Sequence, residues 1–273
     1  MKIENLLDLE RYPLGDREDP RRLAVVKQCK TDLANQLYCV IPNIVLPAAL
    51  DAMSSEASDL ESESNHNNSL RNCYLHRQID PSLPKDHPRN LQDRSSLRMI
   101  AYDQVSSGSP LKLFYQSDLV RKLVAEIVGE GDLFDNEDPY QPANYVCYRD
   151  GDESSWHFDS DNSFTMTLMI QPANSGGQFQ MSPNTRSLPE QNYGHVSDVL
   201  CGKRDDTVVS VGRERGALCI FKGCDSLHRV TPVQGDKLRI MGVFVYEFSP
   251  GVLGDPEVNA TIYGPRVSEA TPR

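Results

Sequence analysis

The chain has 273 residues, of which 38% are hydrophobic and 25% are charged, a composition typical of a folded globular domain and not of a disordered chain. Acidic residues outnumber basic residues by 39 to 28, and the resulting net charge of −11 disfavours nucleic acid as a partner. No apolar run approaches the roughly 18 residues that cross a bilayer, so no membrane partner is expected. The seven scattered cysteines form no CxxC pair, which predicts a cytoplasmic protein with reduced thiols.

Helical spacing of apolar residues indicates two helices in the first third of the chain. The first predicted helix begins at Asp19-Pro20 and ends near Tyr38, with apolar positions at Leu23, Val26, Leu33 and Leu37. The second begins at Pro47, which suits the first turn of a helix, and its apolar stripe consists of Leu46, Leu50, Met53, Ala57 and Leu60. We expect the residues between them, 39–45, to form a short strand or an extended link.

Polar and proline-rich composition predicts irregular structure after the second helix. Residues 62–69 have the sequence SESNHNNS and are expected to form a loop, and three prolines in residues 80–95 favour an exposed connection. The whole segment 54–95 could form a lid over a binding site. Residues 96–105 are a candidate strand, and an amphipathic helix is predicted from Asp118 to the glycines at 129 and 131.

Short strands separated by turn residues dominate the chain after Asp138-Pro139. Each candidate strand is rich in Val, Ile, Phe, Tyr or Thr and is bounded by Gly, Pro, Asn or Asp. The candidates are residues 144–148, 163–171, 177–181, 207–211, 216–221, 228–233 and 238–248. Many short strands at intervals of roughly 8–12 residues favour a sandwich or a barrel over alternating strands and helices.

Two histidines and one aspartate in this strand-rich region are candidate ligands of a metal ion. His157 and Asp159 are two residues apart, so both side chains point to the same face of an extended backbone, and His228 begins another candidate strand. Two imidazoles and one carboxylate on one face of an octahedron are the protein ligands of non-haem Fe(II) oxygenases. Because a His-x-acid triplet is expected by chance in this composition, the interpretation depends on the surrounding strands, the Gly176-Gly177 pair and Arg239.

Five sequence blocks between about residues 140 and 250 resemble the Fe(II)/2-oxoglutarate-dependent dioxygenases, and three of them resemble the prolyl-4-hydroxylase-type branch. The blocks are YRDGD (148–152), WHFD (156–159), GGQF (176–179), GALCIF (216–221) and HRVTPV (228–233). The resemblance implies an α+β, mainly β fold with a double-stranded β-helix (jelly-roll, cupin-like) core on which N-terminal helices pack. It implies a single domain over residues 1–273, with an N-terminal helical part (1–95), the jelly-roll core (96–250) and a C-terminal tail (251–273).

The same resemblance implies Fe(II) as the cofactor and 2-oxoglutarate and O2 as co-substrates. His157, Asp159 and His228 match the catalytic iron ligands of the family. Arg239 matches the residue that pairs with the distal carboxylate of 2-oxoglutarate, and a planar guanidinium suits a carboxylate enclosed in a barrel. Two further candidates for contact with 2-oxoglutarate, each of which also fits simple packing in a strand, are Tyr148 and Thr231.

A finer resemblance concerns the substrate. The N-terminal helices and the segment Asp86-His87-Pro88-Arg89 are similar to small hydroxylases and radical halogenases that act on free amino acids. Halogenating members carry glycine or alanine where this chain has Asp159, so the carboxylate implies hydroxylation. We therefore expect hydroxylation of an unactivated C–H bond in a small polar substrate. A free amino acid is the favoured substrate class, and within that class lysine or another basic amino acid is favoured. Candidate substrate residues, each of which also fits an ordinary structural or surface role, are Trp156, Asp161, Arg94 and Arg98.

Two other functions are compatible with the sequence. One is hydroxylation of a protein or peptide side chain of the prolyl type, and the other is a non-catalytic jelly-roll that binds a metal or a ligand as a sensor. A nucleic-acid demethylase is disfavoured, because that family carries a second arginine six residues after the first and this chain has Val245 there.

Overall fold

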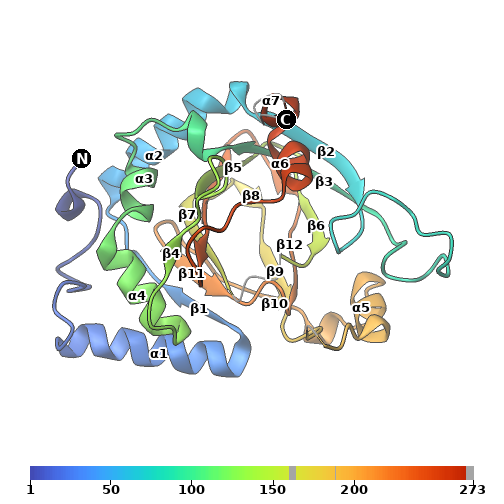
Figure 1. Ribbon diagram of the computed structural model, residues 1–273, viewed down its shortest axis with the longest axis horizontal. Coiled ribbons are helices and arrows are strands. Elements are labelled where there is room, and N and C mark those ends of the chain that lie inside the picture. Colours follow the sequence, from blue (N-terminus) through green and yellow to red (C-terminus); the bar gives the residue numbers. More distant parts are fainter. Residues whose placement is uncertain (160–163, 188, 269–273) are drawn as a thin grey trace.

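Two antiparallel sheets form the centre of the computed structural model, which describes residues 1–159, 164–187 and 189–268 (Figure 1). The seven-stranded sheet contains, in spatial order, β1 (Tyr38–Ile41), β11 (Leu218–Phe221), β7 (Thr165–Gln171), β14 (Arg239–Phe244), β5 (Ala143–Tyr148), β3 (Asp93–Ile100) and β2 (Asn65–Arg71). The four-stranded sheet contains β10 (Val209–Ser210), β9 (Phe179–Ser182), β12 (Leu227–Val230) and β6 (Ser154–His157). Two short pairs join β13 (Val233–Gln234) to β8 (Ser175–Gly176) and β15 (Tyr246–Glu247) to β4 (Phe134–Asp135).

The chain alternates between the two main sheets as it advances. From β5 it passes to β6, returns to β7, crosses to β9 and β10, and then visits β11, β12 and β14 on alternating sheets. This winding is a double-stranded β-helix, which confirms the expected fold class, and each candidate strand after residue 140 overlaps at least one strand of the structure. The first residue of the candidate 163–171 lies outside the described residues, and β7 accounts for its remainder.

Helices cover the outer face of the seven-stranded sheet (Figure 1). Those on this side are α1 (Pro20–Gln36), α2 (Pro47–Leu60), α3 (Pro110–Tyr115) and α4 (Asp118–Val128); α5 (Tyr193–Leu200) lies on the opposite side of the molecule, near the loop that follows β2. On β7, Met166, Leu168 and Ile170 join the core beneath the helices, whereas Thr165 and Thr167 face the space between the sheets. The period of two along the strand thus separates a packed core from a cavity.

Local signals explain where the helices begin and end. The Asp19 side chain accepts a hydrogen bond from the Arg21 amide and caps α1, whose first residue is Pro20. Gly129 adopts a left-handed conformation with φ of 85° and ends α4, as the sequence predicts. The predicted face of α1 is partly wrong, because Leu23 is exposed and the buried Arg22 pairs instead with Glu126 at 2.6 Å. Among the described helices, none combines the length and the apolar character needed to cross a membrane.

The predicted loop at residues 62–69 is wrong. A short 3-10 helix at 61–63 is followed by β2, which pairs with β3 along its whole length. On β2, Asn67 and Arg71 are buried while His66, Asn68 and Leu70 are exposed. Apart from the exposed Leu70 the strand is polar on both faces, because its inner face borders a cavity and its outer face meets solvent, so hydrophobic alternation gives no signal. β3 also begins earlier than expected, at Asp93, and ends at Ile100.

Much of the segment suggested as a lid is part of the regular structure. Residues 54–60 belong to α2 and residues 65–71 to β2, so the irregular connection is confined to residues 72–92. The side chain of Asn72 anchors this loop, donating to the carbonyl of Arg89 at 2.6 Å and accepting from the amides of Tyr74 and His76. The chain beyond residue 250, expected as a tail, contains α6 (Pro256–Tyr263) and α7 (Pro265–Ser268).

Candidate metal centre

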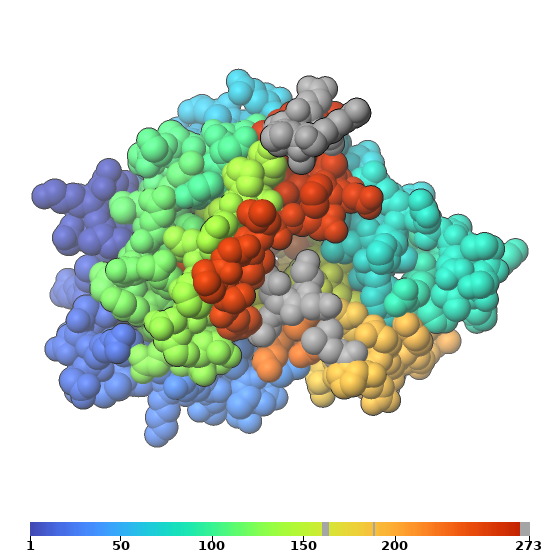
Figure 2. All heavy atoms as spheres, in the orientation of Figure 1, coloured from blue at the N-terminus to red at the C-terminus, as the bar shows by residue number. Residues whose placement is uncertain are grey.

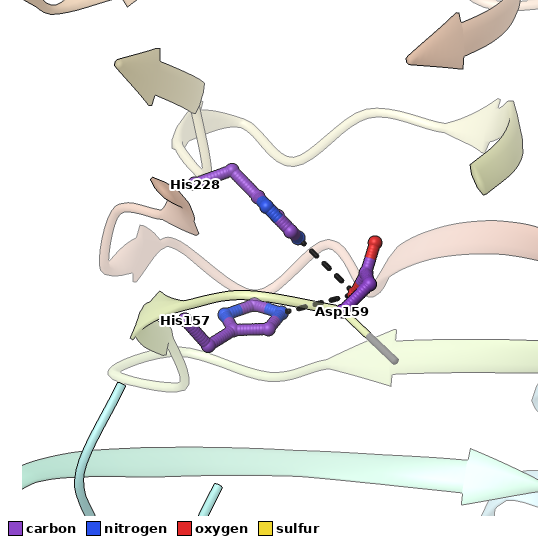
Figure 3. A group of neighbouring side chains, drawn as sticks. All are labelled: His157, Asp159 and His228. Atoms are coloured by element: carbon purple, nitrogen blue, oxygen red, sulfur yellow. Dashed lines mark ion pairs between the residues drawn. The ribbon is translucent and has the colours of Figure 1, made fainter. Parts of the chain in front are cut away.

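Strand pairing brings the two histidines together. β6 and β12 are antiparallel neighbours in which His157 and His228 are directly opposite each other, and their ring centroids are 4.2 Å apart. Asp159 follows the end of β6, where its amide donates to the carbonyl of Gly223 in the turn before β12. Oδ1 of Asp159 lies 3.8 Å from Nε2 of His157 and 3.4 Å from Nε2 of His228 (Figure 3). The structure therefore places all three predicted ligands at one point.

Hydrogen bonds on the far side of each ring determine which nitrogen is available to a metal. Nδ1 of His157 lies 2.7 Å from the carbonyl of Ser155, and Nδ1 of His228 lies 3.0 Å from the carbonyl of Ser226. A carbonyl oxygen can only accept, so Nδ1 carries the proton and Nε2 presents its lone pair. Burial, assisted by the neighbouring His228, lowers the pKa of His157 to about 3, which keeps this imidazole neutral at physiological pH.

A tailored pocket holds the carboxylate of Asp159. Its Oδ2 accepts a hydrogen bond from the hydroxyl of Thr165, and a Cβ at Gly223 would collide with the same oxygen. Burial alone would raise the pKa of Asp159, but the two histidines and the Thr165 hydroxyl hold it well below its ordinary value. The aspartate is therefore ionised, and it presents Oδ1 to the point that both Nε2 atoms face.

The three donor atoms fit a single divalent cation. They all lie within 4.8 Å of one another, and atoms bound to one ion at roughly 2.1 Å lie about 3–4 Å apart. Two imidazoles and one carboxylate on the same side leave further coordination positions on the ion, which is the donor set of a non-haem iron centre. These residues would hold a ferrous ion without rearrangement of the backbone.

A cavity of about 200 Å³ between the two sheets is lined by these three residues and by Arg239. The Arg239 side chain is 1% exposed, its Nε donates to the carbonyl of Gly177, and its two terminal nitrogens have no hydrogen-bond partner among the described residues. Its guanidinium carbon lies 5.0 Å from the ring centroid of Tyr148, and burial lowers its pKa to about 10. A buried cation with two unused donor groups fits the far carboxylate of a keto acid.

The glycine pair before β9 makes room for this arginine. A Cβ on Gly177 would lie 2.7 Å from Cδ of Arg239, and one on Gly176 would collide with the carbonyl of Pro232. Both glycines have positive φ, 66° at Gly176 and 59° at Gly177, a conformation that other residues adopt at a cost. Of the pair singled out in the sequence, Gly177 thus packs against Arg239, and Gly176 packs against the carbonyl of Pro232.

Tyr148 and Thr231 are the other two residues proposed for contact with 2-oxoglutarate, and only Tyr148 borders the cavity. Tyr148 lines it and is 5% exposed. Thr231 is not among the lining residues, and its hydroxyl accepts a hydrogen bond from the amide of Gln178 at 2.9 Å. That bond ties the end of β12 to the segment before β9, so the structure gives Thr231 a place in the sheet and not in the cavity.

The candidate substrate residues that the structure describes, Trp156, Arg94 and Arg98, do not line the cavity either. Trp156 packs in a separate cluster beneath the Arg229 guanidinium, 4.6 Å from its ring. Arg94 is largely exposed, 3.8 Å from Glu153. Asp161 lies outside the described residues.

Arg98, the fourth candidate, is held by two acids. Its Nε lies 2.9 Å from the buried Glu61 and its NH1 lies 2.7 Å from Asp152. Two of its three nitrogens are therefore engaged by carboxylates inside the protein, and Arg98 is not among the residues that line the cavity.

Asn67, Arg71 and Arg213 are among the polar residues of the cavity that are absent from the sequence-based candidates. Asn67 and Arg71 come from β2, where their spacing of four places them on one face, and Arg213 comes from the segment between β10 and β11. Recognition of residues 65–71 as a strand would have indicated the first two. Nothing in the sequence distinguishes Arg213 from Arg215, two positions further on.

Comparisons with known proteins agree with this geometry. The chain is 14% identical to a 2OG-Fe(II) oxygenase family oxidoreductase from Burkholderia pseudomallei, with a TM-score of 0.50, and 83% of this chain aligns with 92% of that one. A prolyl hydroxylase from Trichoplax adhaerens, in complex with a hypoxia inducible factor peptide, is 16% identical with a TM-score of 0.52 over 84% of this chain and 94% of its own. The HygX protein of Streptomyces hygroscopicus, with nickel, 2-oxoglutarate and hygromycin B bound, is 10% identical with a TM-score of 0.52 over 83% and 88%. These likenesses establish the fold of the 2-oxoglutarate oxygenases.

No curated protein matches the chain. A family model described as Halogenase D matches residues 22–252, which include both main sheets and all three candidate metal ligands. Because this match covers well over half of the residues, the chain belongs to the Halogenase D family.

Proposed function

We propose that the protein is an Fe(II)- and 2-oxoglutarate-dependent dioxygenase that hydroxylates a small polar substrate, with a free amino acid as the favoured class. One observation carries the proposal: a single cavity contains both the cluster of His157, Asp159 and His228 and the buried guanidinium of Arg239, whose terminal nitrogens lack partners among the described residues. The cluster suits ferrous iron, and the guanidinium suits the far carboxylate of 2-oxoglutarate.

Each part of the cavity has a task in this proposal. The iron with 2-oxoglutarate and O2 supplies an oxidant able to break an unactivated C–H bond. The two histidines and Asp159 hold the ion, and Arg239 anchors the keto acid beside Tyr148. Apolar side chains from both sheets, including Met241, exclude water from the reacting atoms.

Asp159 supports hydroxylation, although the chain belongs to a family named for halogenation. The third protein ligand fills the position that a halide would need, and Thr165 and Gly223 shape the surrounding pocket for a carboxylate. Replacement of the aspartate by a small residue would leave the Thr165 hydroxyl without this acceptor. The centre is therefore built for three protein ligands.

Arg71 supports a substrate that carries a carboxylate. It is 9% exposed, lines the inner cavity and also an outer groove, and its Nε donates to the hydroxyl of Ser95 at 3.2 Å. Asn67 lies on the same strand face. A free amino acid could place its carboxylate on Arg71. Asp159 is the one acid among the described lining residues of the inner cavity, so the preference for a basic amino acid rests on the net charge.

A peptide substrate is the second candidate, because the inner cavity adjoins a groove of about 810 Å³. The two share Arg71, Leu75 and Ile262, and the groove lies between the loop that follows β2 and α6. In the space-filling view the C-terminal segment, coloured red, lies beside the teal segment that contains this loop (Figure 2). A groove of this size could hold several residues of a peptide.

The test is a screen of the free amino acids for succinate release that depends on substrate, with mass detection of a product heavier by one oxygen atom. We expect one or a few amino acids to stimulate release in the iron-loaded protein, and His228→Ala to remove it. Proline-containing peptides are screened in parallel, and turnover of a peptide alone would favour the second candidate. Anaerobic Fe(II) with 2-oxoglutarate should give a visible charge-transfer band. A protein that lacks this band and releases no succinate with any substrate would contradict the proposal and favour a sensor.

A further inference from the structure

A second arginine shares the cavity with Arg239. Arg213 lies between β10 and β11, and its side chain reaches into the space between the sheets. Its NH1 donates to the hydroxyl of Thr167 at 2.7 Å, and its guanidinium carbon lies 3.9 Å from the ring centroid of Phe179. One hydrogen bond and one aromatic face therefore hold the plane of the guanidinium in place.

The described residues do not neutralise these two charges. Nε of Arg213 and both terminal nitrogens of Arg239 are buried and have no hydrogen-bond partner within the described part of the chain. Asp159, the acid among the described lining residues, has its oxygens directed at the histidines and at Thr165. Buried cations without counter-charges are costly, so this end of the cavity is suited to an anion that accepts several hydrogen bonds.

Contacts place Arg213 near Arg239. The guanidinium of Arg213 covers the ring of Phe179, which lies two residues along the chain from Gly177, whose carbonyl accepts from Arg239. Burial lowers the pKa of Arg239, Tyr148 raises it and Arg213 lowers it further, so the two cations also repel each other.

We propose that Arg213 is a second binding residue for the distal carboxylate of the keto acid, which it shares with Arg239. One arginine can donate two parallel hydrogen bonds to a carboxylate, and a second guanidinium can donate to the lone pairs that remain. The negative charge of the carboxylate in turn reduces the repulsion between the two cations. Thr167 positions Arg213, as Gly177 positions Arg239. This inference rests on the proposed function, since it assigns a further residue to the 2-oxoglutarate that the function requires.

The test measures binding and not turnover. Isothermal titration of the Mn(II)-loaded protein compares 2-oxoglutarate with 2-oxopentanoate, a keto acid of the same length without the distal carboxylate. Arg213→Met should weaken 2-oxoglutarate about ten-fold to a hundred-fold and leave 2-oxopentanoate unchanged. The matched control is Arg215→Met, because Arg215 lies on the same segment but binds Asp51 and the carbonyl of Ile170 outside the cavity. It should change neither affinity.

Two variants keep the result interpretable if Arg213→Met folds poorly. Arg213→Lys retains the charge without the planar fork and should lose part of the affinity for 2-oxoglutarate alone. Thr167→Val removes the hydroxyl that orients Arg213 and should cause a smaller loss of the same kind.

Each contrary result has a definite meaning. Equal weakening of both keto acids by Arg213→Met, or no weakening of either, would overturn the assignment of Arg213 while leaving the proposed function intact. Failure of the unsubstituted protein to bind 2-oxoglutarate at all would overturn the proposed function itself, and this inference with it.

Discussion

The hydroxyl of Thr165 donates a hydrogen bond to Oδ2 of Asp159, while Oδ1 of the same carboxylate faces Nε2 of both histidines. One oxygen is thus occupied within the protein and the other is directed at the metal position. This division favours coordination through a single oxygen, which conserves positions on the ion for other ligands.

Loss of this hydrogen bond should weaken metal binding. Thr165→Val keeps the shape of the side chain but frees Oδ2, so the carboxylate can rotate away from the ion. We expect a loss of about ten-fold to a hundred-fold in affinity for Fe(II) or Mn(II), measured by competition with a chelator. Thr231→Val is the matched control, since its hydroxyl contacts the Gln178 amide away from the centre. Equal affinities for both variants would contradict this role of Thr165.

The identity of the third ligand should decide the product. In the presence of chloride and its substrate, the unsubstituted enzyme is expected to give the hydroxylated product, because Asp159 occupies the position that a halide would need. Asp159→Gly should abolish hydroxylation, whether or not halogenation follows. Mass spectrometry of the products distinguishes the two outcomes, and a mainly chlorinated product from the unsubstituted enzyme would refute the assignment.

Gly177→Ala should interfere with Arg239. The added methyl group would lie 2.7 Å from Cδ of the arginine, and the φ of 59° is unfavourable for alanine. We expect the KM for 2-oxoglutarate to rise about ten-fold or more, with metal affinity unchanged, because the guanidinium must shift. Gly108→Ala provides the control, since no atom lies within 4 Å of a Cβ at that position. An unchanged KM in Gly177→Ala would show that Arg239 tolerates the methyl group.

Stability of the metal-free protein should decrease as the pH falls. His157 has a pKa of about 3 in the folded protein, against an ordinary value of 6.5, so the unfolded chain binds more protons between these values. Stability from this group is complete above about pH 6.5 and is lost toward pH 3, by up to ~1.4 kcal/mol per pH unit. Urea unfolding between pH 7 and pH 4.5 measures this slope. His157→Gln should reduce it, and an identical slope in the variant would argue against a buried neutral imidazole.

Arg98 and Arg94 should differ in what they contribute. Arg98 joins the buried Glu61 to Asp152, so Arg98→Met should lower the free energy of unfolding by about 2–3 kcal/mol, because each buried carboxylate loses a charged hydrogen-bond donor while Glu61 keeps Arg149 and Asp152 keeps Ser96. Arg94 forms a solvent-exposed pair with Glu153, and Arg94→Met should cost less than about 1 kcal/mol. Urea unfolding gives both values. A higher substrate KM in Arg98→Met without loss of stability would instead make Arg98 a substrate residue.

Local pattern was sufficient for much of the architecture. Helical periodicity and capping residues placed α4 between Asp118 and its terminal Gly129, and β-branched runs between turn residues located β5 and β14. These signals work because the residues that make the interactions are near one another in the chain. The spacing of His157 and Asp159 belongs to the same class, since two residues in extended backbone share a face.

Hydrophobic pattern failed where a strand borders a cavity. Residues 65–71 present Asn67 and Arg71 inward and His66, Asn68 and Leu70 outward, so no alternation of apolar and polar residues identifies β2. A polar inner face is stable there because the strand pairs with β3 along its length and its side chains border a hollow in place of a packed core.

The contents of the cavity depend on contacts between distant segments. Arg213 meets Thr167 across 46 positions of sequence, and Arg239 meets Gly177 across 62. Which of the chain's arginines enter the space between the sheets follows from the pairing and register of those sheets. The sequence records which chemical groups the residues carry, whereas the winding of the strands decides which of these groups face the cavity of about 200 Å³.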